Sequence, residues 1–314
     1  MEKKSYTFGL ISDVHIDREG GGERAYFRMA EENFADALRF FRERDTAFIL
    51  SAGDQITAAE DVEPEWDAFR RIIRDAGYDR PIFAAFGNHE ARTAYTRGVP
   101  MTELYHAFLA ATREHRGFDA AGELYYRFTE PMFGDRFIVM ACEGGMQVPF
   151  VDEFSSSQLD WLEAQLIEAQ REHRRVFLVQ HASVYGCGVG DDADRPAYDG
   201  SLHTGEDFPN NTRFMRLLSE YPDTIWLSGH THVDLRDGVN YRKAPDSCHM
   251  IHIPALCGTK RLISGDGGRR VMDRTFRPDT AQAYLVRVFE DRAEFIGVNC
   301  NTGEELGITI TVRS

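Results

Sequence analysis

The chain has 314 residues, of which 42% are hydrophobic, and a formal net charge of -15 from 36 basic and 51 acidic residues. This composition is typical of a globular protein with a sizeable core, and its acidity argues against a nucleic-acid or anionic-membrane partner. No run of 18 apolar residues is present, so no transmembrane helix is expected.

The first half of the chain alternates apolar runs, typical of buried strands, with segments of helical periodicity. In chain order these are strand 6–12, helix 23–44, strand 47–52, helix 64–76, strand 82–86 and helix 101–115. Two further runs, 124–128 and 137–141, flank a turn and predict a β-hairpin.

The second half continues in the same way. Its predicted elements are helix 157–173, strand 176–180, helix 208–221, strand 224–228, strand 250–253, and a hairpin of strands 283–289 and 293–300. Two segments, 183–206 and 255–280, are predicted to be long and poorly structured loops.

This order of elements indicates an α/β fold with a largely parallel first sheet, and the hairpins indicate a second sheet that is mixed or antiparallel. The chain contains no Pro/Ser-rich linker and no internal repeat. We therefore expect residues 1–314 to form a single domain.

Metal-binding residue types follow five of the predicted strands. They are Asp13 and His15, Asp54, Asn88 and His89, His181, and His230 and His232. In doubly wound sheets, ligands bind outside the carboxyl ends of the strands, so we expect these side chains to meet at one edge. Three of them, Asp54, Asn88 and His230, follow a glycine, which leaves room for the backbone to approach a ligand.

Carboxylate and imidazole groups together suit Mn, Fe, Co or Zn, whereas Mg prefers oxygen ligands. Any one of these residues could instead be a strand-end cap or a core histidine. Recurrence at five strand ends favours a metal site, and eight side chains are too many for one ion. Two ions that share a carboxylate would use seven, and two metals about 3.5–4 Å apart can clamp an in-line displacement at phosphorus.

The order of the motifs resembles that of the calcineurin-like metallophosphoesterases, over about residues 6–300. The motifs are DVH (13–15), GD (53–54), GNHE (87–90), His181 and GHTH (229–232). The resemblance implies a four-layer α/β/β/α sandwich with two mixed sheets. It also implies one ion held by Asp13, His15, Asp54 and His232, and a second held by Asp54, Asn88, His181 and His230.

By the same resemblance, His89 is not a metal ligand but assists the leaving group or binds the phosphoryl oxygens. The implied reaction is hydrolysis of a small phosphomonoester or phosphodiester by a hydroxide that bridges two Mn, Fe or Zn ions. Length and motif spacing resemble the class III cyclic nucleotide phosphodiesterases. No tyrosine stands in residues 53–56, where purple acid phosphatases carry a ligand, which argues against an Fe(III)–tyrosinate centre. Glu90 is expected to orient neighbouring groups or to support the turn.

Two alternatives stay open. One is a Ser/Thr protein phosphatase, although no arginine motif specific to that class matches cleanly. The other is a non-catalytic metal-binding scaffold of the same fold, although such scaffolds usually lose a ligand or the non-ligand histidine, and all eight are present here.

Weaker candidates lie near the motifs and in the two long segments. Four basic residues of the second segment could hold substrate phosphate or an acidic group, or could lie on a solvated surface: Lys260, Arg261, Arg269 and Arg270. Arg92 and Arg97 follow the third motif and could line the pocket rim. Asp191, Asp192 and Asp194 are expected to form a solvated loop, with a third cation as a minor option. His203 and His252 could approach the centre, and Cys187 and Cys257 are expected to be inert thiols.

The five cysteines are widely spaced and include no Cys-x-x-Cys pair, which is typical of a reducing compartment. The first residues lack the apolar core and cleavage site of a signal peptide. We therefore expect a cytoplasmic protein whose partner is a small phosphoester, with no prediction of its oligomeric state.

Overall fold

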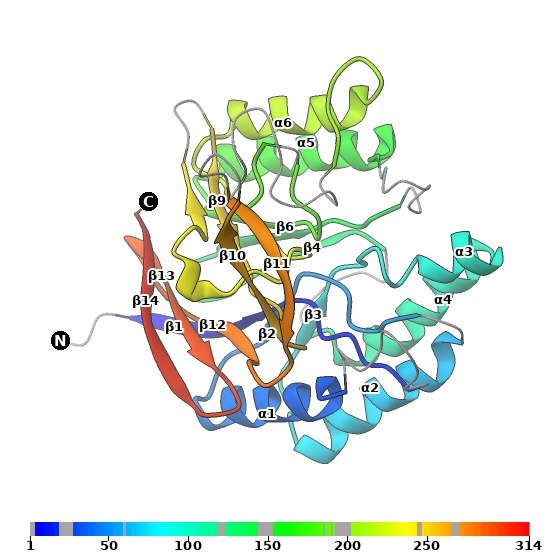
Figure 1. Cartoon of the computed structure of the whole chain (residues 1–314). Coiled ribbons are helices and arrows are strands. Elements are labelled where there is room, and N and C mark those ends of the chain that lie inside the picture. Colours follow the sequence, from blue (N-terminus) through cyan, green and yellow to red (C-terminus); the bar gives the residue numbers. More distant parts are fainter. Residues whose placement is uncertain are drawn as a thin grey trace.

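Two mixed sheets of six strands each form the centre of the molecule in the computed structural model (Figure 1). The structure describes residues 4–18, 28–58, 61–117, 124–143, 153–184, 186–189, 191, 202–243, 247–265 and 270–313. In these parts of the chain, no helix combines the length and the apolar character needed to cross a bilayer.

The first sheet has the strand order β14-β13-β12-β1-β2-β3. Its strands are β1 (Ser5–Ile11), β2 (Ile49–Ser51), β3 (Ile82–Ala84), β12 (Gln282–Phe289), β13 (Arg292–Asn299) and β14 (Glu304–Arg313). Strands β1, β2 and β3 are parallel neighbours, and the last three strands extend the sheet antiparallel from β1.

The second sheet has the order β4-β5-β6-β7-β9-β8. Its strands are β4 (Tyr126–Thr129), β5 (Arg136–Val139), β6 (Val176–Val179), β7 (Ile225–Ser228), β8 (Tyr241–Arg242) and β9 (His249–His252). Strands β5, β6, β7 and β9 are parallel, and β4 and β8 pair antiparallel at the two edges.

Helices cover the outer face of each sheet, at the bottom and the top of Figure 1. Against the first sheet pack α1 (Ala30–Glu43), α2 (Val62–Ala76) and α4 (Met101–Thr112); against the second pack α5 (Ser156–Arg171) and α6 (Pro209–Glu220). Shorter helices are α3 (Arg92–Arg97), η2 (Arg113–His115) and η3 (Leu235–Asp237). Asp61 and Ser155 are the N-caps of α2 and α5. Their side chains accept hydrogen bonds from backbone N–H groups in the first turn of each helix, which have no partner within the helix.

The inner faces of the two sheets enclose an aromatic core. Alternate residues of the strands point into it, and the rings of Phe128 and Phe177 stack on either side of Phe137, with centroids 4.7 Å away in each case. The opposite face of β1 lies so close to α1 that a Cβ on Gly9 would meet the ring of Phe41 at 2.8 Å. The predicted four-layer α/β/β/α sandwich is thus confirmed.

Two sequence predictions about the later part of the chain need correction. Residues 255–280 were expected to be a poorly structured loop, but β10 (Thr259–Ser264) and β11 (Arg270–Arg277) form an antiparallel hairpin within them. Strand β14 was not predicted. β10 and β11 are mostly half-buried and β14 is mostly exposed, and all three are rich in charged residues or threonine, so they lack the apolar runs that marked the buried strands. Asp192, Asp194 and Arg269 lie outside the described residues.

Candidate metal centre

The candidate ligands lie at the carboxyl ends of parallel neighbouring strands. β1, β2 and β3 lead to Asp13, Asp54 and Asn88, while β6 and β7 lead to the histidines of the second sheet. Backbone hydrogen bonds continue beyond the strands, since Asp13 N donates to Gly53 O (3.0 Å) and Gly229 N donates to His181 O (2.9 Å). The two sheets are joined at the site, where His230 N donates to Asp13 Oδ2 (2.9 Å).

One group of ligand atoms surrounds His232. Its Nε2 lies 3.2 Å from Asp13 Oδ1 and 3.2 Å from His15 Nε2. His15 Nε2 in turn lies 3.7 Å from both Asp13 Oδ1 and Asp54 Oδ2. All four side chains are buried, so their charges interact with little screening by water.

A second group surrounds His181. Its Nε2 lies 3.0 Å from Asp54 Oδ2 and 3.2 Å from His230 Nδ1. Asn88 is buried as well, and its Oδ1 accepts no hydrogen bond from any described residue. Asp54 therefore takes part in both groups.

These distances fit ligands of common ions. When two ligand atoms each lie about 2.0–2.1 Å from one ion and the angle between them at the ion is about 90–109°, they lie about 2.9–3.4 Å apart. The closest pairs in the two groups lie 3.0–3.2 Å apart. Asn88, whose neighbour His89 donates its N–H to Asp54, offers a buried amide oxygen that has no donor among the described residues. Carboxylate, imidazole and amide groups together form a donor set suited to transition metals.

Backbone groups orient the ligand side chains. His181 Nδ1 faces Ala52 O at 3.0 Å, and because a carbonyl only accepts, Nδ1 carries a proton and Nε2 is the nitrogen that faces the site. Asp54 Oδ1 accepts from His89 N (2.8 Å), which leaves Oδ2 directed at His181. The two oxygens of Asp13 also have different partners: Oδ2 accepts from His230 N, and Oδ1 faces His232 Nε2.

Five of the candidate ligand residues adopt left-handed backbone conformations. Their φ angles are 53° for Asp13, 52° for His15, 55° for Asp54, 71° for His230 and 58° for His232. This region is sparsely populated by residues other than glycine, and such strain gathers at functional sites. Neighbouring glycines allow the close approach: a Cβ on Gly229 would lie 2.7 Å from Asp13 Oδ2, and one on Gly87 would lie 2.6 Å from Asp54 N.

The charges of the buried histidines differ. Burial opposes protonation of His181, but the Asp54 and Asp13 carboxylates outweigh it and raise its pKa to about 9. Burial and the charge of His181 lower the pKa of His230 to about 3, and burial lowers that of His232 to about 4. Imidazoles with such low pKa values are neutral at pH 7, as metal ligands must be.

His89 lies beside the first group. Its ring centroid is 4.4 Å from that of His15, and the two rings are nearly perpendicular. Its Nδ1 lies 2.9 Å from Thr57 O, so Nδ1 carries a proton and Nε2 is the atom able to exchange one. Burial lowers the pKa of His89 to about 3, against the opposing effect of Asp54.

Glu90, which sequence reasoning left outside the catalytic set, connects two of the ligand loops. Its carboxylate accepts from Gly87 N (2.8 Å), Asp54 N (3.0 Å) and Gln55 N (2.6 Å). Burial and the charge of Asp54 raise its pKa to about 8, and the Gln55 and Gly87 N–H groups oppose that rise. Glu90 thus supports the loop that presents Asp54 and Asn88.

Replacing Glu90 by Ala should destabilise the metal-free protein by at least about 2 kcal/mol, because each buried N–H left without an acceptor costs about 1–3 kcal/mol. Chemical denaturation of the metal-free protein measures the change. The exposed Glu103 in α4 supplies the control, Glu103→Ala, which should change stability little. A Glu90→Ala variant as stable as this control would contradict the role assigned to the carboxylate.

The weaker candidates are distributed as follows. Arg92 is partly buried three residues after His89, whereas Arg97 and Arg270 are exposed. Lys260 is close to the site because its N donates to His232 O (2.7 Å), but Arg261 is paired with Asp237.

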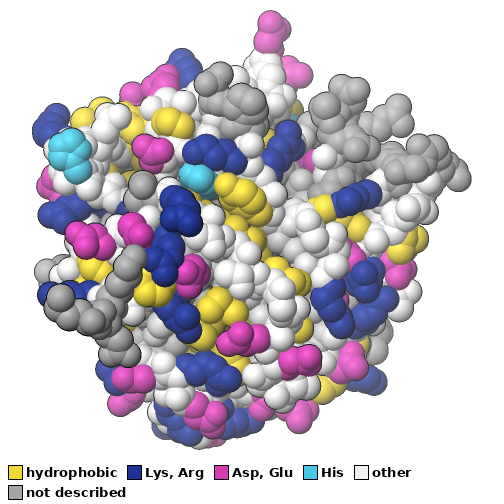
Figure 2. Space-filling view, turned by 90° about the vertical axis from the view of Figure 1, so that its left-hand side faces the viewer, with side chains coloured by type: hydrophobic (Ala, Val, Ile, Leu, Met, Phe, Trp, Pro, Cys, Tyr) yellow, Lys and Arg dark blue, Asp and Glu magenta, His cyan; other side chains and the backbone are white. Residues whose placement is uncertain are grey.

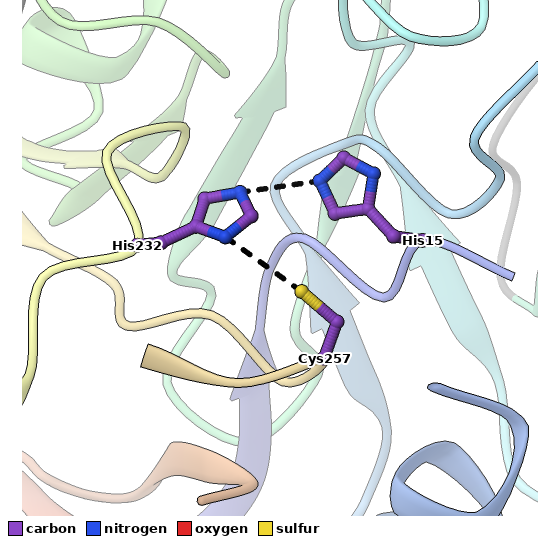
Figure 3. A group of neighbouring side chains, drawn as sticks. All are labelled: His15, His232 and Cys257. Atoms are coloured by element: carbon purple, nitrogen blue, oxygen red, sulfur yellow. Dashed lines mark hydrogen bonds between the residues drawn. The ribbon is translucent and has the colours of Figure 1, made fainter. Parts of the chain in front are cut away.

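His252 is buried and its Nε2 lies 3.0 Å from Thr231 Oγ1, so it reaches the loop between two ligands. Cys257 Sγ lies 3.7 Å from His232 Nδ1 (Figure 3). Sequence reasoning allowed His252 to approach the centre, but it treated Cys257 only as an inert thiol. Cys257 could have been suspected only from its position in a segment that follows the last motif.

The fold and these two groups of candidate ligands form a candidate centre for two transition-metal ions in a four-layer α/β/β/α sandwich. Residues 6–234 match the calcineurin-like phosphoesterases. The chain belongs to this family of metal-dependent phosphoric ester hydrolases.

Similar proteins agree with this assignment. The chain is 26% identical to purple acid phosphatase 21 and 25% identical to purple acid phosphatase 22, both from Arabidopsis thaliana, over 73% and 75% of its own length. It spans 45% and 47% of those two proteins, less than half of each.

Solved structures share the fold. A dimetal phosphatase from Danio rerio superposes with a TM-score of 0.68 at 18% identity, covering 98% of both chains. A purple acid phosphatase from Lupinus luteus superposes with a TM-score of 0.63 at 15% identity, covering 99% of this chain and 54% of that one.

Proposed function

We propose that the chain hydrolyses small phosphoesters at a dinuclear metal centre. The observation that carries this proposal is the sharing of Asp54 between two ligand groups, with His89 beside them but turned to Thr57 through Nδ1. The family and the names of the two plant phosphatases support it.

We assign one ion to Asp13, His15, Asp54 and His232, and the other to Asp54, Asn88, His181 and His230. When bound, the two ions supply Lewis acidity that polarises phosphoryl oxygens and activates water. Only two carboxylates, Asp13 and Asp54, belong to the set, so two divalent ions leave the centre positive. That local charge explains how a chain with a net charge of -15 attracts an anionic substrate.

His89 serves the leaving group in this proposal. Thr57 O holds Nδ1, so the ring keeps a fixed orientation and Nε2 alone exchanges a proton with the leaving oxygen. The charge of a bound phosphoryl group stabilises the imidazolium form, which burial alone disfavours. Arg92, partly buried three residues after His89, adds positive charge to its surroundings and by itself lowers the pKa of the imidazole.

A substrate panel tests the proposal. Protein loaded with Mn is assayed with p-nitrophenyl phosphate, bis-p-nitrophenyl phosphate and cyclic nucleotides. Since both plant relatives are named as phosphatases, we expect the monoester to be hydrolysed fastest. Inactivity on the whole panel by protein that holds two ions per chain would contradict the proposal and favour the scaffold alternative.

A further inference from the structure

We propose that Cys257 is a positioning residue of this centre: its sulfur accepts a hydrogen bond from Nδ1–H of His232 and keeps Nε2 directed at the ligand group. The inference rests on the proposed function only in taking His232 as a metal ligand. Figure 3 shows that one nitrogen of the His232 ring faces His15 and the other faces the thiol.

The two nitrogens of His232 face different partners. Nε2 lies 3.2 Å from Asp13 Oδ1 and 3.2 Å from His15 Nε2, whereas Nδ1 lies 3.7 Å from Cys257 Sγ. If Nε2 is to present its lone pair to an ion, the ring proton must reside on Nδ1, and the sulfur is the acceptor placed there. The thiol hydrogen has its own acceptor in Gly258 O, 4.0 Å from the sulfur.

The backbone fixes both members of this pair. Cys257 N donates to Asp13 O (3.0 Å), so the cysteine is attached to the loop that carries a ligand. On the other side, Lys260 N donates to His232 O (2.7 Å). Cys257 is fully buried and packs with Ala30 and Ala255, which leaves the sulfur little freedom to move.

The same arrangement occurs elsewhere in the site with a different acceptor. His181 Nδ1 faces a backbone carbonyl, Ala52 O, at 3.0 Å. Metal-ligating histidines generally donate their second N–H to such a partner, and loss of the partner lowers metal affinity about 10–100-fold. At His232 the partner is a side chain, so its contribution can be removed by substitution.

Metal titration of Cys257 variants tests the proposal without reference to catalysis. In Cys257→Ala, we expect the affinity for one of two Zn ions to fall about 10–100-fold, with the other ion unaffected. Cys257→Ser should restore much of the affinity, because a hydroxyl oxygen also accepts the hydrogen bond. The matched control is Cys300→Ala, which removes a buried thiol after β13 and should leave both affinities unchanged.

Two results would overturn the inference. One is unchanged Zn affinity in Cys257→Ala, or in Cys257→Val should the Ala variant not fold, because neither side chain can accept the hydrogen bond. The other is a sulfur-to-cobalt charge-transfer band in wild-type protein loaded with Co, which would make the sulfur a direct ligand. Failure of the proposed function looks different, since wild-type protein would then fail to bind two ions or would bind both without hydrolysing any ester.

Discussion

Replacing Asp54 by Asn should reduce the metal content of the purified protein below two ions per chain and nearly abolish phosphoester hydrolysis. Asp54 Oδ2 lies 3.0 Å from His181 Nε2 and 3.7 Å from His15 Nε2, so this one oxygen faces both ligand groups. Asn has nearly the same shape and can still accept from His89 N, which now bonds to Asp54 Oδ1. The substitution therefore removes the shared charge with little change in packing.

The expected loss in kcat/KM is at least about 1000-fold, because metal ions contribute several kcal/mol to stabilising the charge of the transition state and each 1.36 kcal/mol is a factor of ten. Elemental analysis gives the metal content and steady-state kinetics gives the rate. Asp75→Asn, at an exposed position of α2, is the control. An Asp54→Asn protein that keeps two ions and wild-type activity would refute the shared-carboxylate assignment.

Replacing His89 by Ala should lower kcat about 100- to 10,000-fold and leave two ions in place. The size of the loss should depend on the leaving group. A p-nitrophenolate leaves readily without a proton, so p-nitrophenyl phosphate should be affected least. An alkyl phosphate, whose alkoxide needs the proton, should be affected most.

The comparison of the two substrates separates proton transfer from a structural effect. His106→Ala, at an exposed position in α4, should match the wild type on both. Equal losses on the aryl and alkyl esters would contradict the proton-transfer role. Loss of an ion from His89→Ala would instead place His89 among the ligands, since a ligand atom of His89 lies within 4.8 Å of atoms of His15 and Asp54.

The layered fold and the meeting of the candidate ligands at one edge could be predicted because both depend on buried parallel strands. An apolar run followed by Asp13 or His181 is visible in the sequence. Parallel neighbouring strands bring the residues at their carboxyl ends together, independently of the structure of the other segments. The β10–β11 hairpin escaped prediction because its strands are mostly only half-buried and carry no apolar run.

The interactions that support the ligands could not be predicted for a different reason. Glu90 bonds to backbone N–H groups, which leave no trace in a side-chain pattern. Cys257 meets His232 only because backbone hydrogen bonds connect both of their segments to the same region, and no periodicity relates positions 25 residues apart.

The left-handed ligands also imply a trade-off. Asp and His tolerate this backbone region better than most residues, but glycine would occupy it with less strain. Five positions thus favour glycine on grounds of metal-free stability while the proposed chemistry demands a donor side chain. A lineage that abandoned hydrolysis would gain stability by exchanging donors for glycine, and this chain has made none of those exchanges.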